Sequence, residues 1–163
     1  MSLEGKKALV TGGGRGIGEA IARKLASQGA SVIVCGRKEA PLQKVAEEIS
    51  GKAMVVDLMD RAATDAFLAE LQSKDAIDIL VNNAGIAESA PLHKVDDEMW
   101  DRMMELNAMA GFRIIRALVP PMIEKGFGRV INLASNAGVS GYGYTAAYCA
   151  SKHAMVGLSL IHI

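Results

Sequence analysis

Three side chains toward the end of the sequence have the types needed to move a proton to or from a carbonyl oxygen. Tyr148 and Lys152 are four residues apart in a helical pattern, so both project from one face of a helix. A free tyrosine titrates near 10, and an adjacent ammonium favours the phenolate, which suits proton exchange closer to neutral pH. Ser135 follows a predicted strand and could hydrogen-bond the same oxygen. The three residues predict a general acid–base site centred on Tyr148.

A glycine-rich turn, TGGGRGIG at residues 11–18, follows the first predicted strand and leads into a helix. Glycines let the backbone bend sharply and approach a pyrophosphate, which the free N–H groups at the helix start can hold. The spacing fits TGxxxGxG. It does not fit a P-loop, because Glu19 follows Gly18, nor GxGxxG, because position 17 is Ile. The alternative is a tight strand–helix connection without a ligand. The predicted cofactor-binding residues are Gly12, Arg15, Gly16, Ile17 and Gly18.

The end of the second predicted strand indicates which nucleotide the turn would bind. An acidic residue there would bind the ribose 2′-OH of NAD and repel the 2′-phosphate of NADP. The sequence instead reads Cys35-Gly36-Arg37-Lys38, with no carboxylate before Glu39. Arg37, with Arg15 from the turn, could form charge-assisted bonds to a 2′-phosphate. The pattern favours NADP, with NADPH preferred over NADH; the alternative is that both arginines are merely solvated.

Two other groupings have less support. Cys149 and His153 are also four residues apart and could suggest a thiol–imidazole pair, but the sequence supplies no third group to orient them. Their side chains also point about 100° around the helix from the Tyr–Lys face. His93 has no partner at ligand spacing, so no metal site is expected.

Taken in chain order, these motifs resemble the short-chain dehydrogenase/reductase family, in the subgroup with a TGxxxGxG turn. The resemblance covers the chain up to Gly157, and the nearest look-alikes are 3-oxoacyl reductases. The matching segments are TGGGRGIG at 11–18, Asp57-Leu58, NNAG at Asn82–Gly85, Asn107, Ser135 and YCASK at Tyr148–Lys152.

The resemblance implies an NADP-dependent oxidoreductase that interconverts a ketone, or a 3-oxoacyl thioester, and a secondary alcohol by hydride transfer. Its implied catalytic residues are Asn107, Ser135, Tyr148 and Lys152, with Tyr148 as general acid/base and Asn107 sustaining a water relay to Lys152. Tyr148 and Lys152 would also bind the cofactor, with Lys152 holding the nicotinamide ribose. Asp57 and Leu58 would flank the adenine, and Asn83, Ala84 and Gly85 would line the cofactor cleft. A nucleotide-binding redox sensor and a non-catalytic fragment are the alternatives.

The elements that must position these residues alternate between short apolar runs and longer helical patterns. This order predicts an α/β fold with a doubly wound parallel sheet of the Rossmann type, in a single domain. Asp60 and Asp96 are expected to cap helix starts, and Gly29 to end the first helix. The predicted strands are Lys6–Val10, Ser31–Cys35, Lys52–Val56, Ile77–Val81 and Gly128–Leu133. The predicted helices are Ile17–Gln28, Glu39–Ile49, Arg61–Lys74, Asp97–Lys125 and one from Ala146 onward.

Composition restricts the expected partners. Half of the 163 residues are apolar, and Lys plus Arg equal Asp plus Glu at 18 each, which argues against a nucleic-acid surface. No apolar run approaches the roughly 20 residues that cross a membrane. Cys35 and Cys149 are far apart and no signal peptide precedes Lys6, so a cytoplasmic protein is expected. The expected partner is a small-molecule or carrier-bound carbonyl substrate, and the resemblance implies a homodimer or homotetramer.

The family pattern continues beyond this sequence with two more strands and a substrate-covering segment. Residues 1–163 are therefore expected to be an incomplete NAD(P)-binding domain that lacks its last strands and is itself inactive. Its fifth strand would be left as an apolar edge that invites association. Residues 158–163 are interpreted as foreign sequence at the end of a truncated reading frame; the alternative is a natural short product.

Overall fold

The computed structural model describes residues 2–74 and 76–160 and divides the chain into two compact units. The first unit comprises Met1–Ala84 and Ile114–Ile131, and the second comprises Gly85–Arg113 and Asn132–Ile163. Of the segment 158–163, residues 161–163 lie outside the described residues.

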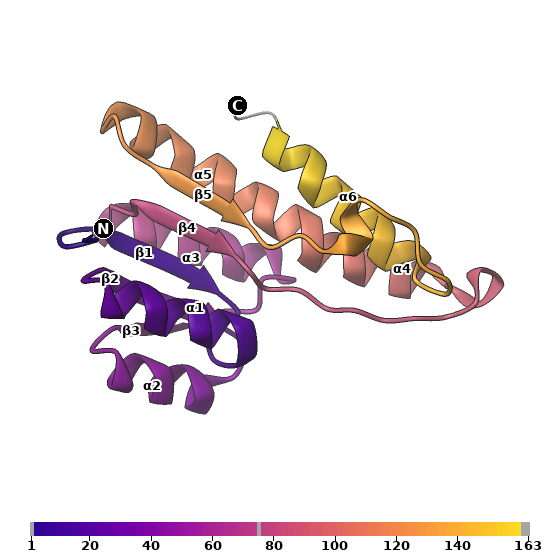
Figure 1. The fold of residues 1–163 in the computed structure, drawn as a ribbon, viewed down its shortest axis with the longest axis horizontal. Coiled ribbons are helices and arrows are strands. Elements are labelled where there is room, and N and C mark those ends of the chain that lie inside the picture. Colours follow the sequence, from indigo (N-terminus) through magenta and orange to yellow (C-terminus); the bar gives the residue numbers. More distant parts are fainter. Residues whose placement is uncertain (1, 75, 161–163) are drawn as a thin grey trace. The chain divides into compact units, whose positions relative to one another are not determined.

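The first unit is built on a five-stranded sheet in the order β3-β2-β1-β4-β5 (Figure 1). β1 runs parallel to β2, with Leu9 opposite Ile33, and parallel to β4, with Leu9 opposite Leu80. The predicted doubly wound parallel sheet is confirmed, and β5 lies at its edge, as expected. The strands are β1 (Lys7–Thr11), β2 (Ser31–Gly36), β3 (Lys52–Val55), β4 (Ile79–Asn82) and β5 (Arg129–Asn132).

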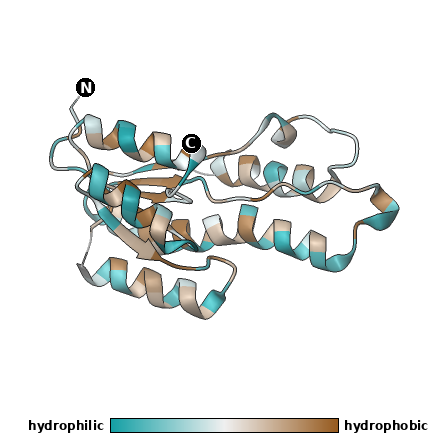
Figure 2. Cartoon of the chain, turned by 90° about the horizontal axis from the view of Figure 1, so that it is seen from below, coloured by the Kyte–Doolittle hydropathy of each residue, from teal (hydrophilic) through white to brown (hydrophobic). Residues whose placement is uncertain are grey.

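Helices cover both faces of this sheet, which explains why its strands show no polar alternation. In Figure 1, α1 lies in front of the strands, α2 lies below them next to β3, and α3 lies behind β1 and β4. Leu9, Val34 and Leu80 are fully buried between them, and Figure 2 colours these strands largely hydrophobic. On the α3 side, Gln72 Nε2 donates to Ala117 O on α5 at 2.9 Å. The helices are α1 (Gly16–Ser27), α2 (Glu39–Glu48), α3 (Arg61–Lys74) and α5 (Ala110–Glu124), the last belonging to this unit from Ile114.

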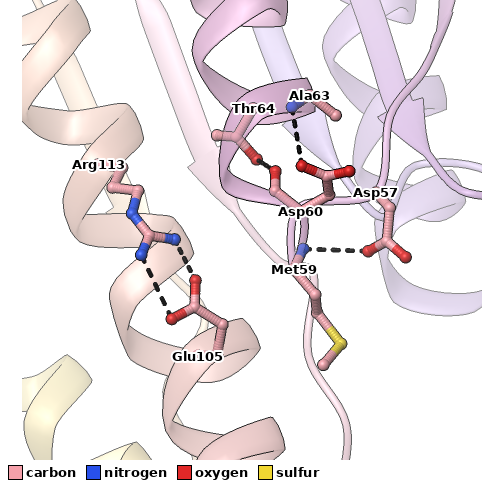
Figure 3. Close-up of polar contacts among 7 residues, drawn as sticks. All are labelled: Asp57, Met59, Asp60, Ala63, Thr64, Glu105 and Arg113. Carbon is pink, nitrogen blue, oxygen red and sulfur yellow. Dashed lines mark hydrogen bonds and ion pairs between the residues drawn. The ribbon is translucent and has the colours of Figure 1, made fainter.

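The predicted helix boundaries are confirmed where polar or glycine residues fix them. Asp60 Oδ1 accepts from the Ala63 N–H at 3.0 Å at the start of α3, as Figure 3 shows. Asp96 Oδ1 accepts from the Met99 N–H at 2.8 Å at the start of α4 (Asp97–Met104). Gly29, just after α1, has a φ of +96°, the left-handed conformation that ends a helix.

The second unit is helical, and here one sequence prediction was wrong. The pattern at Asp97–Lys125 predicted an uninterrupted α-helix, but a π-helical segment, Glu105–Met109, separates α4 from α5. The interruption has a physical cause, because Asn107 at its centre is buried and its amide bonds outside the helix. α6 (Ala146–Leu160) and two 3-10 turns, Leu92–Lys94 and Asn136–Gly138, complete this unit.

In the first unit, the N-terminal ends of three strands meet at Asp78. Its Oδ2 accepts from the Lys7 N–H at 2.8 Å, its Oδ1 accepts from Lys125 Nζ, and its carbonyl accepts from the Arg129 N–H at 2.9 Å. Burial alone would raise the pKa of Asp78, but the bonds from Lys125 and Lys7 and the nearby charge of Lys6 outweigh it and lower the pKa. Ionised Asp78 therefore stabilises the folded state.

We predict that Asp78→Ala lowers the free energy of unfolding by about 2–3 kcal/mol, because the part-buried Lys7 amide loses the carboxylate that accepts its hydrogen bond. Asp78→Asn should cost only about 1 kcal/mol, since an amide oxygen still accepts from Lys7 and the half-exposed Lys125 contributes little. The difference in free energy of unfolding between the wild-type protein and Asp78→Asn should be constant above about pH 5. It should shrink as the pH falls through the lowered pKa of the Asp78 carboxyl group. Denaturant titrations at several pH values measure this; an Asn variant as unstable as the Ala variant would contradict it.

Candidate functional site

Thr11 ties the glycine-rich turn to the end of β4. Its hydroxyl accepts from the N–H groups of Asn83, at 3.0 Å, and Ala84, at 2.9 Å, and donates to Val81 O at 3.4 Å. In return, Asn83 Nδ2 donates to Thr11 O at 2.8 Å and to Gly12 O at 3.3 Å. The structure thus brings together Gly12, Asn83 and Ala84, three of the residues predicted to bind the cofactor.

Two glycines make this turn possible. Gly12 has a φ of +65°, and a Cβ on Gly18 would lie 2.3 Å from Gly12 O and 2.5 Å from Asn83 Nδ2. Any side chain at position 18 would push α1 away from the turn, so the close approach of helix to strand requires glycine. The N–H groups of Gly12 and Gly13 donate to Cys35 O at the end of β2, which orients the turn against both strands.

The start of α1 fits the pyrophosphate of a dinucleotide. Arg15, which precedes the helix, makes no side-chain capping bond, so none of the first N–H groups is capped by that residue. A Cβ on Gly16 would meet nothing within 4 Å, and Ile17 is 68% exposed, so the approach to these N–H groups is open. Arg37 is exposed just beyond β2. Cationic Arg15 and Arg37 suit a phosphate, and the residue types at this edge suit the group that the motif predicts.

Asp57 and Leu58 lie just beyond β3 in the same unit. Asp57 Oδ1 accepts from the Met59 N–H at 3.0 Å (Figure 3), which folds the chain back on itself after the strand. Leu58 is 3% exposed and forms part of the core. Asp57 is therefore the more accessible of the two.

In the second unit, Asn107 is 1% exposed, and both its amide oxygen and its amide nitrogen are hydrogen-bonded. Its Oδ1 accepts from the Ile86 N–H at 2.8 Å, and its Nδ2 donates to Ile86 O at 2.8 Å and to Ser151 Oγ at 3.0 Å. Ser151 Oγ in turn donates to Tyr148 O at 2.8 Å. These bonds connect the π-helical segment, the chain after Gly85 and helix α6.

Tyr148 and Lys152 share one face of α6, as predicted. Lys152 Nζ lies 5.9 Å from the centroid of the Tyr148 ring and donates to Leu133 O at 2.7 Å. Lys152 is buried, and burial lowers the pKa of its ammonium from the ordinary value. A Cβ on Gly85 would lie 3.0 Å from Asn107 Oδ1 and 3.6 Å from Lys152 Nζ, so Gly85 joins this group.

Ser135 lies three residues after β5 and begins the short turn Asn136–Gly138. Its hydroxyl accepts from the Ala137 N–H at 3.1 Å and donates to Asn136 Oδ1 at 3.1 Å. Asn136 is exposed, so this second bond can be exchanged for one to a ligand. The hydroxyl is then available as a donor.

Sequence reasoning missed three residues that organise these groups. Thr11 was included in the motif but not among the binding residues, and Ile86 and Ser151 were not singled out. A hydroxyl at the end of a buried strand and another inside the Tyr–Lys helix turn were the available signals. Ile86 offers no such signal, because it contributes only its backbone.

The alternative groupings find no support in the described part of the chain. His153 Nδ1 lies 2.9 Å from Cys149 O, and the Cys149 thiol lies 3.2 Å from Thr145 Oγ1, so imidazole and thiol have other partners. Burial raises the pKa of the Cys35 thiol to about 12, so it stays protonated at neutral pH. Among residues 2–74 and 76–160, no cluster of His, Cys, Asp or Glu could hold a metal ion, and no helix is long and apolar enough to span a membrane.

Comparisons with known proteins agree with these features. A family model described as short chain dehydrogenase matches residues 6–161. The 3-oxoacyl-(acyl-carrier-protein) reductase FabG of Escherichia coli (strain K12) is 38% identical over 98% of this chain and 66% of its own length. Nodulation protein G of Rhizobium sp. (strain N33) is 41% identical over 96% of this chain and 65% of its own length.

A solved structure shows that the similarity includes the fold. It is assigned as an NAD(P) dependent gluconate 5-dehydrogenase from Beutenbergia cavernae, with NADP bound at low occupancy. Its TM-score is 0.91 at 40% identity, over 96% of this chain and 65% of that one. The chain thus spans about two thirds of the length of the relatives it matches, 66% for the E. coli protein.

Proposed function

The chain belongs to the short-chain dehydrogenase family, and from this premise we propose that the protein is an NADP-dependent oxidoreductase interconverting a ketone and a secondary alcohol. The observation that carries the proposal is the grouping of half-buried Tyr148 with buried Lys152 and Asn107. Lys152 Nζ lies 5.9 Å from the Tyr148 ring, and Ser151 Oγ links the Asn107 amide to the Tyr148 backbone carbonyl. A sensor without turnover would need no proton donor, so this grouping favours an enzyme over the sensor that the sequence left open.

The first unit is proposed to bind the nucleotide. Its pyrophosphate would lie on the N–H groups at the start of α1, beside Gly12, Gly16, Ile17 and Gly18. Arg15 and Arg37 would bind the 2′-phosphate, and Asp57 and Leu58 would flank the adenine. Asn83 and Ala84 would line the cofactor cleft, with Thr11 holding both in place. When bound, the nicotinamide supplies or accepts the hydride.

The second unit is proposed to handle the proton. Tyr148 Oη donates a proton to the carbonyl oxygen during reduction and removes it in the reverse direction. Ser135 exchanges its bond to Asn136 for one to the same oxygen and orients it. The Lys152 cation, 5.9 Å from the Tyr148 ring, stabilises the charge that Tyr148 acquires as its proton leaves.

Lys152 and Asn107 would resupply that proton. Burial weakens the hold of Lys152 on its own proton, which suits a group that passes protons on. Lys152 would also hold the nicotinamide ribose. Both amide hydrogens of Asn107 are used by Ile86 and Ser151, so a water relay could contact the amide only at the second lone pair of Oδ1.

The proposed substrates are small or carrier-bound ketones, including 3-oxoacyl thioesters. The name of the E. coli relative supports the thioester, and the gluconate 5-dehydrogenase assignment of the structural neighbour supports a wider carbonyl class. We also propose a cytoplasmic homodimer or homotetramer. Exposed apolar side chains of the second unit support association: Trp100 is 42% exposed, Met109 40% and Phe112 38%.

We predict that Arg37→Ala weakens NADPH binding by about 1–3 kcal/mol and leaves NADH binding nearly unchanged, because only NADPH carries the 2′-phosphate. Fluorescence titration with each cofactor measures the two dissociation constants. Lys44→Ala, which removes an exposed cation from α2, is the matched control and should change neither dissociation constant. Equal losses of affinity for NADPH and NADH in Arg37→Ala would show that Arg37 does not bind the 2′-phosphate.

We further predict that Tyr148→Phe lowers kcat by about 10²–10⁴-fold while NADPH affinity and folding persist, because only the proton donor is removed. Oxidation of NADPH by the full-length protein, with a panel of 3-oxoacyl thioesters and cyclic ketones, measures turnover. Cys149→Ser, next to it on α6, is the control and should retain activity, which also tests the thiol–imidazole alternative. A Tyr148→Phe variant with a tenth or more of wild-type turnover would place the proton donor elsewhere.

A further inference from the structure

An ion pair brackets the π-helical segment that carries Asn107. Arg113 Nη1 and Nη2 donate to Glu105 Oε1 and Oε2, the second pair at 3.3 Å, in the two-pronged arrangement that Figure 3 shows. Glu105 is the first residue of the segment, and Arg113 lies on α5 after the segment has ended. The partners are eight residues apart, whereas ion pairs along a regular helix join residues three or four apart.

The pair also differs from the exposed ion pairs of the chain in its burial. The Arg113 side chain is 10% exposed and that of Glu105 is 28% exposed. By contrast, Arg23, which pairs with Glu19, and Arg102, which pairs with Glu88, are 40% and 41% exposed. A largely buried ion pair adds little net stability, because desolvation of the two charges offsets their attraction. Its best-supported use is to specify one conformation over another.

The conformation that the ion pair would specify is the π-helical register around Asn107, as opposed to that of a regular α-helix. A π-helical segment closes i→i+5 hydrogen bonds, one residue more than an α-helix. Conversion to a regular α-helix would rotate the residues on one side of the segment by about 100° relative to the other. Asn107 at its centre could not keep both Ile86 bonds and the Ser151 bond through such a rotation. The same rotation would separate the Glu105 and Arg113 side chains, so the ion pair and the amide contacts require the same register.

We propose that Glu105 and Arg113 are positioning residues, whose ion pair holds the π-helical segment in register and so fixes the Asn107 amide on Ile86 and Ser151. The inference rests on the proposed function in that the amide it fixes belongs to the proposed proton-handling group. Neither charged side chain acts on substrate. Both act through Asn107, which they hold 3.0 Å from Ser151 Oγ and thereby beside the Tyr148 turn of α6.

The direct test is hydrogen exchange of the Ile86 amide, which donates to Asn107 Oδ1. Glu105→Gln and Arg113→Met should each accelerate its exchange about tenfold or more, toward the rate in Asn107→Ala. The double variant should exchange no faster than either single variant, because both remove one interaction. Glu98→Gln, the same change at an 88%-exposed carboxylate on α4, is the control and should leave the rate unchanged. Unchanged Ile86 exchange in Glu105→Gln and Arg113→Met, or equal acceleration in Glu98→Gln, would overturn the proposal.

Turnover separates this inference from the proposed function. In the active protein, Glu105→Gln should lower kcat about tenfold with the KM for NADPH unchanged within about twofold, and Glu105→Asp should restore most of the loss. A fall in kcat without faster Ile86 exchange would refute the positioning role. Faster Ile86 exchange in a protein that reduces no carbonyl compound would support the positioning role and refute the proposed function.

Discussion

The buried amide of Asn107 imposes the constraint on which the second unit depends. A primary amide taken out of water must find partners for its oxygen and both hydrogens, or the fold loses several kcal/mol. Asn107 finds them on the backbone of Ile86 and on Ser151, and these partners determine how the chain after β4 and helix α6 meet the π-helical segment. Because Ser151 lies on α6 between Tyr148 and Lys152, its bond to Asn107 also fixes the turn of α6 that carries these two residues.

A similar constraint organises the first unit at the carboxyl ends of its strands. Thr11 is buried, and its hydroxyl is satisfied by backbone groups of residues 81–84. The same bonds place the glycine-rich turn, so a buried hydroxyl fixes the proposed nucleotide-binding edge. In both units, polar residues inside the fold select one backbone path, and the exposed residues proposed to meet the cofactor depend on that path.

The sequence predicted those features that depend on local pattern. Apolar runs without alternation indicated β1, β2 and β4, and the caps Asp60 and Asp96 marked helix starts correctly, because both signals act within a few residues. The face shared by Tyr148 and Lys152 followed from helical spacing alone. The π-helical segment could not be predicted in this way. It exists because Asn107 bonds to Ile86, 21 residues earlier, and no local pattern encodes that partner. The pattern also predicted that the fifth strand extends to Leu133, close to Ser135. In the structure β5 ends at Asn132, three residues before Ser135.

NADPH deuterated at C4 of the nicotinamide would show whether the protein transfers a hydride between NADP and a carbonyl carbon. The purified full-length protein, rather than residues 1–163 alone, would be incubated with each of the two C4-labelled forms and a 3-oxoacyl thioester or ketone, and the product would be analysed by mass spectrometry. We expect one of the two forms to yield an alcohol with a single deuterium on the carbinol carbon, in step with NADP formation. NADPH that binds without being consumed, or is consumed without deuterium reaching the product, would contradict it.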